Sequence, residues 1–134
     1  MKDSANQMGN TVLKCQITVT KDANGYNAKY VPEIIPVYEH NTDIHFHIDA
    51  KSSDDVEIDS VGISPLGQNQ LIDPDIKPNR QQYNLKDLNT AKGTFILSFQ
   101  YRDKHGNKLN VVRRLDDNNV ESADVPKIEN NPPG

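Results

Sequence analysis

Two histidines and two carboxylates in the middle of the chain are the residues best suited to chemistry. The run Asp43-Ile44-His45-Phe46-His47-Ile48-Asp49 alternates polar and apolar residues, so as a strand it places His45 and His47 on its polar face. If a hairpin follows, one register sets His47 opposite Glu57 and His45 opposite Asp59. Zinc accepts imidazole and carboxylate ligands in tetrahedral sites. One interpretation of the sequence is therefore a zinc site on the outer face of the 43–60 hairpin, drawn from His45, His47, Glu57 and Asp59, with the two histidines and one of the two carboxylates as ligands.

The same four residues also fit an exposed sheet face that carries opposite charges and needs no cofactor. Cross-strand pairs of this kind are common on antiparallel sheets and contribute only about 0.2–1 kcal/mol each. A third interpretation is a pH-responsive surface, because imidazole titrates at pH ~6.5, about half a unit below neutrality. The spacing alone leaves these alternatives open.

Other catalytic patterns are absent from the sequence. Gly93-Thr94 and Gly62-x-Ser64 match neither a phosphate-binding loop nor a nucleophile elbow. The single cysteine, Cys15, excludes an internal disulfide and fits a reducing compartment. It alternates in phase with Ile17 and Val19, which predicts a buried structural thiol. An enzymatic role is therefore less favoured than a non-enzymatic one.

Alternation of apolar residues predicts strands through most of the chain, and no segment shows sustained helical spacing. Asn24-Gly25 predicts a tight hairpin, and Pro32 and Pro36 indicate that the segment between them is either an edge strand or a crossing segment. A change of phase near Ser60 indicates a bulge. The strongest strand spans residues 94–102, and we expect a hairpin loop at 103–107 and a returning strand at 108–115. Seven or eight short strands predict an all-β, antiparallel sandwich.

Three segments near the end of the predicted domain share a pattern with a known class of module. They are Tyr83-x-Leu85-x-x-Leu88, Gly93-x-Phe95-x-Leu97-x-Phe99-x-Tyr101 and Asp103-x-x-Gly106-Asn107. This series resembles the last three strands of immunoglobulin-like and fibronectin-type modules, without the cysteine pair of antibody domains. The resemblance covers about 30 residues and implies an immunoglobulin-like β-sandwich, but no site.

Domain boundaries follow from where the apolar pattern begins and ends. Only 34% of the 134 residues are hydrophobic, and part of that polarity lies at the two ends. Residues 1–10 and 116–134 contain no periodic apolar residues, which predicts a disordered N-terminal tail and a flexible C-terminal tail. The sandwich domain is expected to span residues 11–115.

Charge and hydropathy exclude several classes of partner. The net charge of −4 and the scattered lysines and arginines argue against nucleic acid as a partner. No apolar run approaches the roughly 20 residues of a membrane span. The first residues lack the apolar stretch of a secretory signal, so we expect a soluble, cytoplasmic protein.

These observations favour a small non-enzymatic binding module, with the zinc-binding protein as the alternative. Sandwiches offer edge strands to other chains, so the partner is expected to be an unidentified protein or a second copy of this chain. Val12, Ile96 and Val112 point away from the predicted core. If they cluster, they form an apolar patch suited to self-association.

Overall fold

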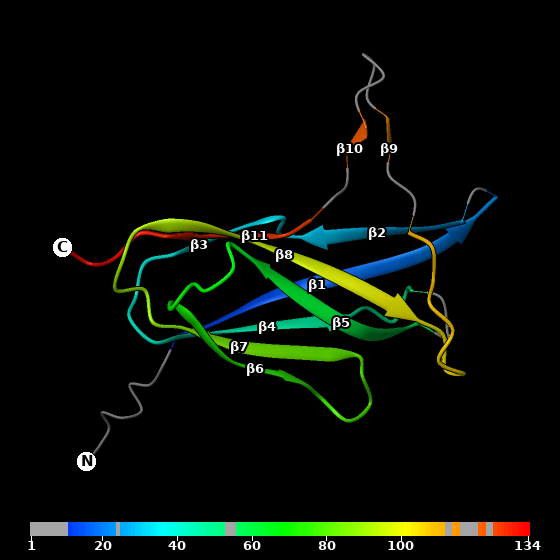
Figure 1. The fold of residues 1–134 in the computed structure, drawn as a ribbon, viewed down its shortest axis with the longest axis horizontal. Helices are drawn as coiled ribbons and strands as arrows, with labels where there is room; N and C mark the ends of the chain where they lie inside the picture. The colour runs from blue at the N-terminus through cyan, green and yellow to red at the C-terminus, as the bar shows by residue number, and fades with distance from the viewer. Residues whose placement is uncertain (1–10, 24, 53–55, 112–113, 116–120, 123–124) are drawn as a thin grey trace.

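The computed structural model shows two β-sheets packed face to face, and several connections between strands pass from one sheet to the other (Figure 1). It describes residues 11–134 except 24, 53–55, 112–113, 116–120 and 123–124. The described part of the chain contains strands and no helix. The strands in chain order are β1 (Val12–Asp22), β2 (Gly25–Val31), β3 (Ile34–Val37), β4 (Thr42–Ile48), β5 (Glu57–Ser64), β6 (Leu71–Ile76), β7 (Gln82–Asp87), β8 (Gly93–Arg102), β9 (Arg114–Leu115), β10 (Glu121–Ser122) and β11 (Lys127–Asn130).

The first sheet has five strands in the order β2-β1-β4-β7-β6. The β1–β2 pair is the predicted hairpin: Asp22 lies opposite Gly25, which has a φ of 129°. Such a positive φ is readily adopted only by glycine, as the Asn-Gly signal indicates. β1 also pairs with β4 in parallel, while β4 with β7 and β7 with β6 are antiparallel.

The second sheet has four strands in the order β3-β11-β8-β5. β8 lies between β11 and β5 and is antiparallel to both, whereas β3 and β11 are parallel. The predicted edge position of the segment between the two prolines is confirmed, because β3 lies at one edge of this sheet. The predicted bulge is also confirmed: the register between β5 and β8 shifts between Ile58 and Ser60.

The core lies between the sheets and follows the alternation of each strand. Alternate residues of β8 point inward and are at most 9% exposed, as the strand pattern predicts. At the centre, Phe99 contacts four other aromatic rings at centroid distances of 5.2–6.2 Å. Those rings are Tyr30, Phe46, Tyr83 and Tyr101. Such contacts add to the stabilisation from burial alone.

The expectation that all strands would be antiparallel is wrong, because both sheets are mixed. An alternating pattern identifies a strand and its buried face but carries no information about which strand lies beside it. The coarser prediction, an all-β fold of two packed sheets, is confirmed.

The predicted flexible tail at 116–134 is wrong for its last part. β11 inserts between β3 and β8, and Ile128 is fully buried in the core. This strand has one apolar residue among polar neighbours, so its periodic signal is too short to be read, and its partners lie far away in sequence. Residues 1–10 and 116–120 lie outside the described residues.

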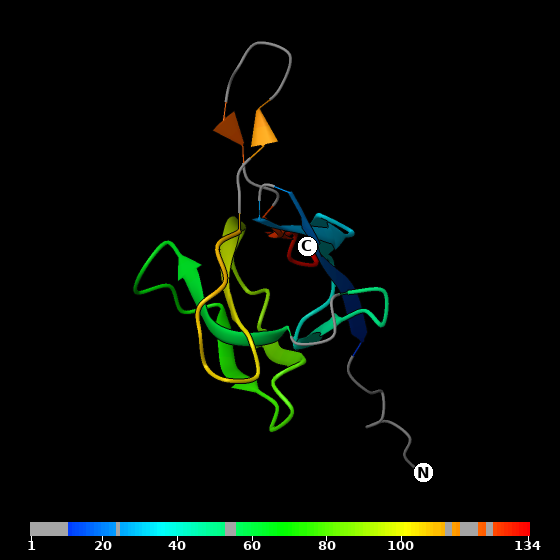
Figure 2. The ribbon, with the colours of Figure 1, turned by 90° about the vertical axis from the view of Figure 1, so that its right-hand side faces the viewer.

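The segment 108–115 does not return along β8 as a full strand. Single bridges join Arg102 to Lys108 and Tyr26 to Val111. Further along, β9 pairs with β10 in a separate two-stranded sheet. Figures 1 and 2 show this small hairpin projecting away from the sandwich. β11 takes the place next to β8 that this segment was expected to fill.

Candidate ligand-binding cleft

The structure does not form the hairpin on which the zinc prediction depended. β4, which carries His45 and His47, lies in the first sheet between β1 and β7. β5, which carries Glu57 and Asp59, lies at the edge of the second sheet and pairs with β8. The predicted register is therefore wrong, because each strand finds its partners elsewhere in the chain.

The neighbours of these side chains confirm the separation. His45 lies opposite Lys14 and Asn84, and His47 lies opposite Gln16 and Gln82, so neither has a carboxylate directly across the sheet. Glu57 accepts a hydrogen bond from Arg102 Nε at 3.1 Å, and Asp59 lies 3.7 Å from Arg102 Nη1. Within the described residues, no group of three or more His, Cys, Asp or Glu side chains could hold a metal ion.

Cys15 is a core residue, as its position in the alternating pattern predicts. It is fully buried, and its thiol donates to the carbonyl oxygen of Pro32 at 3.3 Å. Burial raises the pKa of this thiol to about 12, which keeps it protonated and unreactive at neutral pH. The predicted structural role of the thiol is therefore confirmed by its burial.

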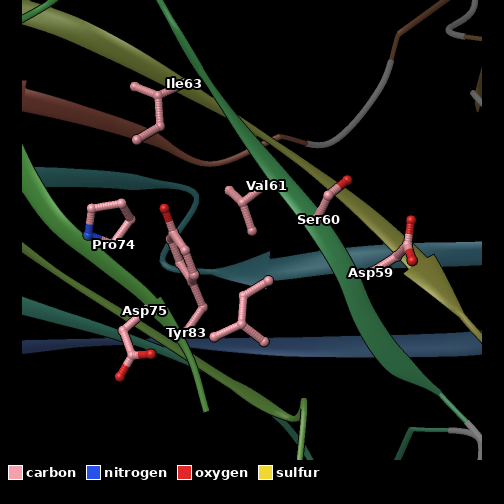
Figure 3. A pocket seen from close by; sticks show the side chains of 8 residues that line it. Asp59, Ser60, Val61, Ile63, Pro74, Asp75 and Tyr83 are labelled. Atoms are coloured by element: carbon pink, nitrogen blue, oxygen red, sulfur yellow. The ribbon is translucent and has the colours of Figure 1, made fainter. Parts of the chain in front are cut away.

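A cleft runs along the open side of the sandwich, where β5 and β6 form the edges of the two sheets. Its volume is about 510 Å³, within the range of small-molecule sites. Figure 3 shows the side chains of both strands surrounding the ring of Tyr83. The lining residues are Asp59, Ser60, Val61, Ile63, Pro74, Asp75, Ile76 and Tyr83.

The walls of the cleft are apolar because the bulge in β5 changes which residues face inward. Beyond the bulge, Val61 and Ile63 are half-buried on the cleft side, while Ser60 faces solvent. Ile76 and Pro74 form the opposite wall on β6. Without the extra residue, Val61 and Ile63 would lie on the other face of their strand.

Tyr83 forms the base of the cleft and presents its only polar atom there. The side chain is 3% exposed, and its ring packs edge-on against Phe99 at 5.6 Å. Within the described part of the chain its hydroxyl makes no hydrogen bond. Burial raises the pKa of Tyr83 to about 12, so the hydroxyl remains a neutral donor at physiological pH.

The two carboxylates at the rim are already paired with basic side chains. Asp75 accepts a hydrogen bond from Lys77 Nζ at 2.9 Å. Asp59 lies 3.7 Å from Arg102 and 4.0 Å from Lys108. The rim is therefore close to electrically neutral and does not favour a strongly charged ligand.

Of the residues that line the cleft, the sequence singled out only Asp59 as a candidate site residue, and it did so as a zinc ligand. The lining residues come from three strands, β5, β6 and β7, which belong to two sheets. No sequence motif with a fixed spacing therefore connects them. The predicted bulge near Ser60 was the one sequence feature that pointed to the cleft, because a bulge changes which residues of the strand face inward.

The predicted apolar patch is also not formed by the residues that can be assessed. Val12 and Ile96 are 45% and 37% exposed, as predicted, but they lie on β1 and β8, in different sheets. Val112 lies outside the described residues. Isolated exposed apolar side chains are ordinary on protein surfaces.

No protein-family model matches the chain, and no curated protein is similar enough in sequence to count as a relative. None of the described segments forms a helix long and apolar enough to cross a membrane.

Proposed function

We propose that the protein is a binding module whose ligand site is the cleft between β5 and β6. The observation that carries this proposal is the Tyr83 hydroxyl, which lies at the base of an apolar cleft and has no hydrogen-bond partner among the described residues. Tyr83 Oη is not among the fully buried, unpaired atoms of the described residues, so it is open to solvent in the cleft. A ligand with an acceptor atom would take the place of that solvent and accept a hydrogen bond from Tyr83, at a net gain of about 0.5–1.5 kcal/mol.

The cleft indicates the chemistry of the ligand. Val61, Ile63 and Ile76 favour a compact apolar body, and the Tyr83 hydroxyl favours one hydrogen-bond acceptor at its inner end. The paired carboxylates at the rim favour an uncharged molecule or segment. An amide with an apolar substituent, including a peptide group beside an apolar side chain, meets all three requirements.

We further propose that the fold is an immunoglobulin-like sandwich with an added N-terminal hairpin. If β1 and β2 are set aside, the neighbours β4-β7-β6 and β11-β8-β5 correspond to the B-E-D and G-F-C strands of such modules. β7 and β8, whose sequences carry the resemblance, lie in opposite sheets as the E and F strands do. In this scheme β11, not the 108–115 segment, is the last strand.

Binding can be tested by NMR titration of the ¹⁵N-labelled full chain with N-benzylacetamide, an uncharged apolar amide. For 11 non-hydrogen atoms at roughly 0.3–0.4 kcal/mol each, we expect a Kd of about 0.6–4 mM. Amide shifts should concentrate on β5, β6 and Tyr83. Loss of one hydrogen bond in Tyr83→Phe should raise the Kd about 2- to 10-fold.

Tyr38→Phe is the matched control, because Tyr38 is 61% exposed and is not part of the cleft. It should leave the Kd unchanged. The proposal fails if the shifts scatter over the surface, or if both tyrosine variants bind as the wild-type chain does.

A further inference from the structure

Of the four edges of the two large sheets, those of β3 and β6 are protected against pairing with another chain, and that of β2 is covered at one end. The β2 edge is covered where the Tyr26 amide donates to the Asn110 carbonyl at 3.2 Å. The β3 edge contains Pro36, and the β6 edge contains Pro74 beside a register shift. Proline and bulges are the usual means by which edge strands avoid pairing.

The β5 edge is covered over only half of its length. At its start, the Ile58 amide donates to the Arg80 carbonyl at 2.7 Å, and Arg80 Nε donates back to the Ile58 carbonyl at 2.9 Å. The remaining stretch, Ser60–Ser64, carries no charge and no proline. Among the described residues, its only backbone partners are those of β8, on its other side.

The backbone groups that face this free side can be identified. The Leu97 amide donates to the Pro126 carbonyl at 3.1 Å, so the backbone of Leu97 points toward β11 and away from β5. Antiparallel strands alternate between pairs that bond each other and pairs that point outward. Ile63, opposite Leu97, and Val61, opposite Phe99, therefore direct their amide and carbonyl groups to the free side.

This stretch is also self-complementary. Its sequence, Ser60-Val61-Gly62-Ile63-Ser64, is symmetric about Gly62 in residue type and size. Two copies placed antiparallel around Gly62 would set Val61 opposite Ile63 of the partner subunit, and Ser60 opposite Ser64 of the partner subunit. Val61 and Ile63 are the residues whose backbone groups point outward. In this symmetric register, the amide and carbonyl groups of Val61 therefore face those of Ile63 of the partner subunit and can form hydrogen bonds with them.

We propose that β5 pairs with β5 of a second copy in this register, which joins the two four-stranded sheets into one continuous sheet. A two-fold axis through Gly62 makes the contact isologous, the commonest arrangement in homodimers. Each subunit contributes one short strand, so the interface is small and the dimer is weak, with a Kd between about 1 µM and 1 mM. The proposal does not depend on a ligand in the cleft.

Sedimentation equilibrium of the full chain, at concentrations from about 10 µM to about 1 mM, measures this Kd. In Gly62→Lys two like charges would face each other across the axis, so the Kd should rise at least about 10-fold. A Cβ at Gly62 meets nothing closer than Ser98 Cβ at 4.0 Å, so the variant should fold. Ser98→Lys is the matched control. Ser98 is exposed and lies opposite Gly62 on β8, so it is one strand away from the proposed contact.

An equimolar mixture of Gly62→Lys and Gly62→Glu should restore association as a heterodimer, because opposite charges then face each other. A wild-type chain that stays monomeric at about 1 mM overturns the proposal. So does a dimer that Gly62→Lys leaves intact, or a mixture in which the two variants stay monomeric.

A disulfide test fixes the register. With Cys15→Ser as background, Gly62→Cys should oxidise to a covalent dimer, because directly opposed residues of a non-bonded pair have Cα atoms about 4.5 Å apart. Ser60→Cys should not, since its equivalent in the partner subunit lies four positions away. Equal rates of cross-linking at the two positions would contradict the register.

Discussion

Asp87 brings a carboxylate into the interior between the two sheets. It is fully buried, its Oδ1 accepts a hydrogen bond from the Asn89 amide at 3.0 Å, and its Oδ2 has no hydrogen-bond partner among the described residues. In the part of the chain that the structure describes, the Oδ1 atoms of Asn89 and Asn130 have no hydrogen-bond partner either. Burial raises the pKa of Asp87, so the protonated form is favoured in the folded state.

This raised pKa predicts a pH-dependent effect of Asp87→Asn. The folded wild-type chain holds the proton more tightly than the unfolded chain, so its stability falls as pH rises from the unfolded pKa, about 3.9, through the folded value. Asparagine does not titrate and brings an amide donor toward the unpaired oxygens. We expect the variant to gain about 1–3 kcal/mol relative to wild type between pH 4 and pH 8.

Urea unfolding of both proteins at the two pH values measures this difference, and contributions from other groups cancel in the comparison. A difference that stays constant between pH 4 and pH 8 would mean that Asp87 does not titrate abnormally.

Cys15 predicts a second measurable effect at the residue scale. With full burial and a thiol pKa of about 12, reaction with Ellman's reagent at pH 8 should be at least about 100-fold slower in the native chain than in guanidinium. The Cys15→Ser variant supplies the blank. Similar rates in the native and unfolded chains would place the thiol at the surface.

Individual residues differ in how far their roles can be predicted from the sequence. The inward position of Cys15 follows from alternation with Ile17 and Val19, which is a local property. The orientation of the Tyr83 hydroxyl is not local, because it depends on Val61 and Pro74 from other strands. Burial of Tyr83 could be predicted, but its unpaired hydroxyl could not.

At the scale of elements, β11 offers the sharpest test of the structure. Ile128→Ala removes a fully buried side chain between the sheets, so it should lower the free energy of unfolding by about 2–5 kcal/mol. Ile34→Ala on the neighbouring strand β3 is the control, because Ile34 is 49% exposed. If urea unfolding shows an equally small loss of unfolding free energy for both variants, residues 127–130 do not form a strand of the core.

Strand identity could be predicted from the sequence much better than strand pairing. β4 and β8 were placed almost to the residue, because each has a long alternating run. The hairpin between His47 and Glu57 failed because it assumed that neighbours in sequence pair in space. Each strand instead buries its apolar face in a different sheet.

At the scale of the whole molecule, composition and alternation predict a two-layered β fold. They do not predict the features that depend on which strands lie side by side in the assembled sandwich. The last strand, β11, is contributed by a segment that looks polar, and the parallel β1–β4 pair joins strands that are far apart in sequence. The cleft exists because β5 and β6, at the edges of different sheets, do not pair with each other. Such an opening is a property of the assembled sandwich.

The most direct test of the proposed binding site is a crystal structure of the full chain soaked with N-benzylacetamide. The proposal predicts the benzyl group between Val61 and Ile76, with the amide oxygen within hydrogen-bonding distance, about 2.5–3.0 Å, of Tyr83 Oη. A cleft left empty while the compound binds elsewhere, or a Tyr83 hydroxyl bonded to another protein group, would contradict it.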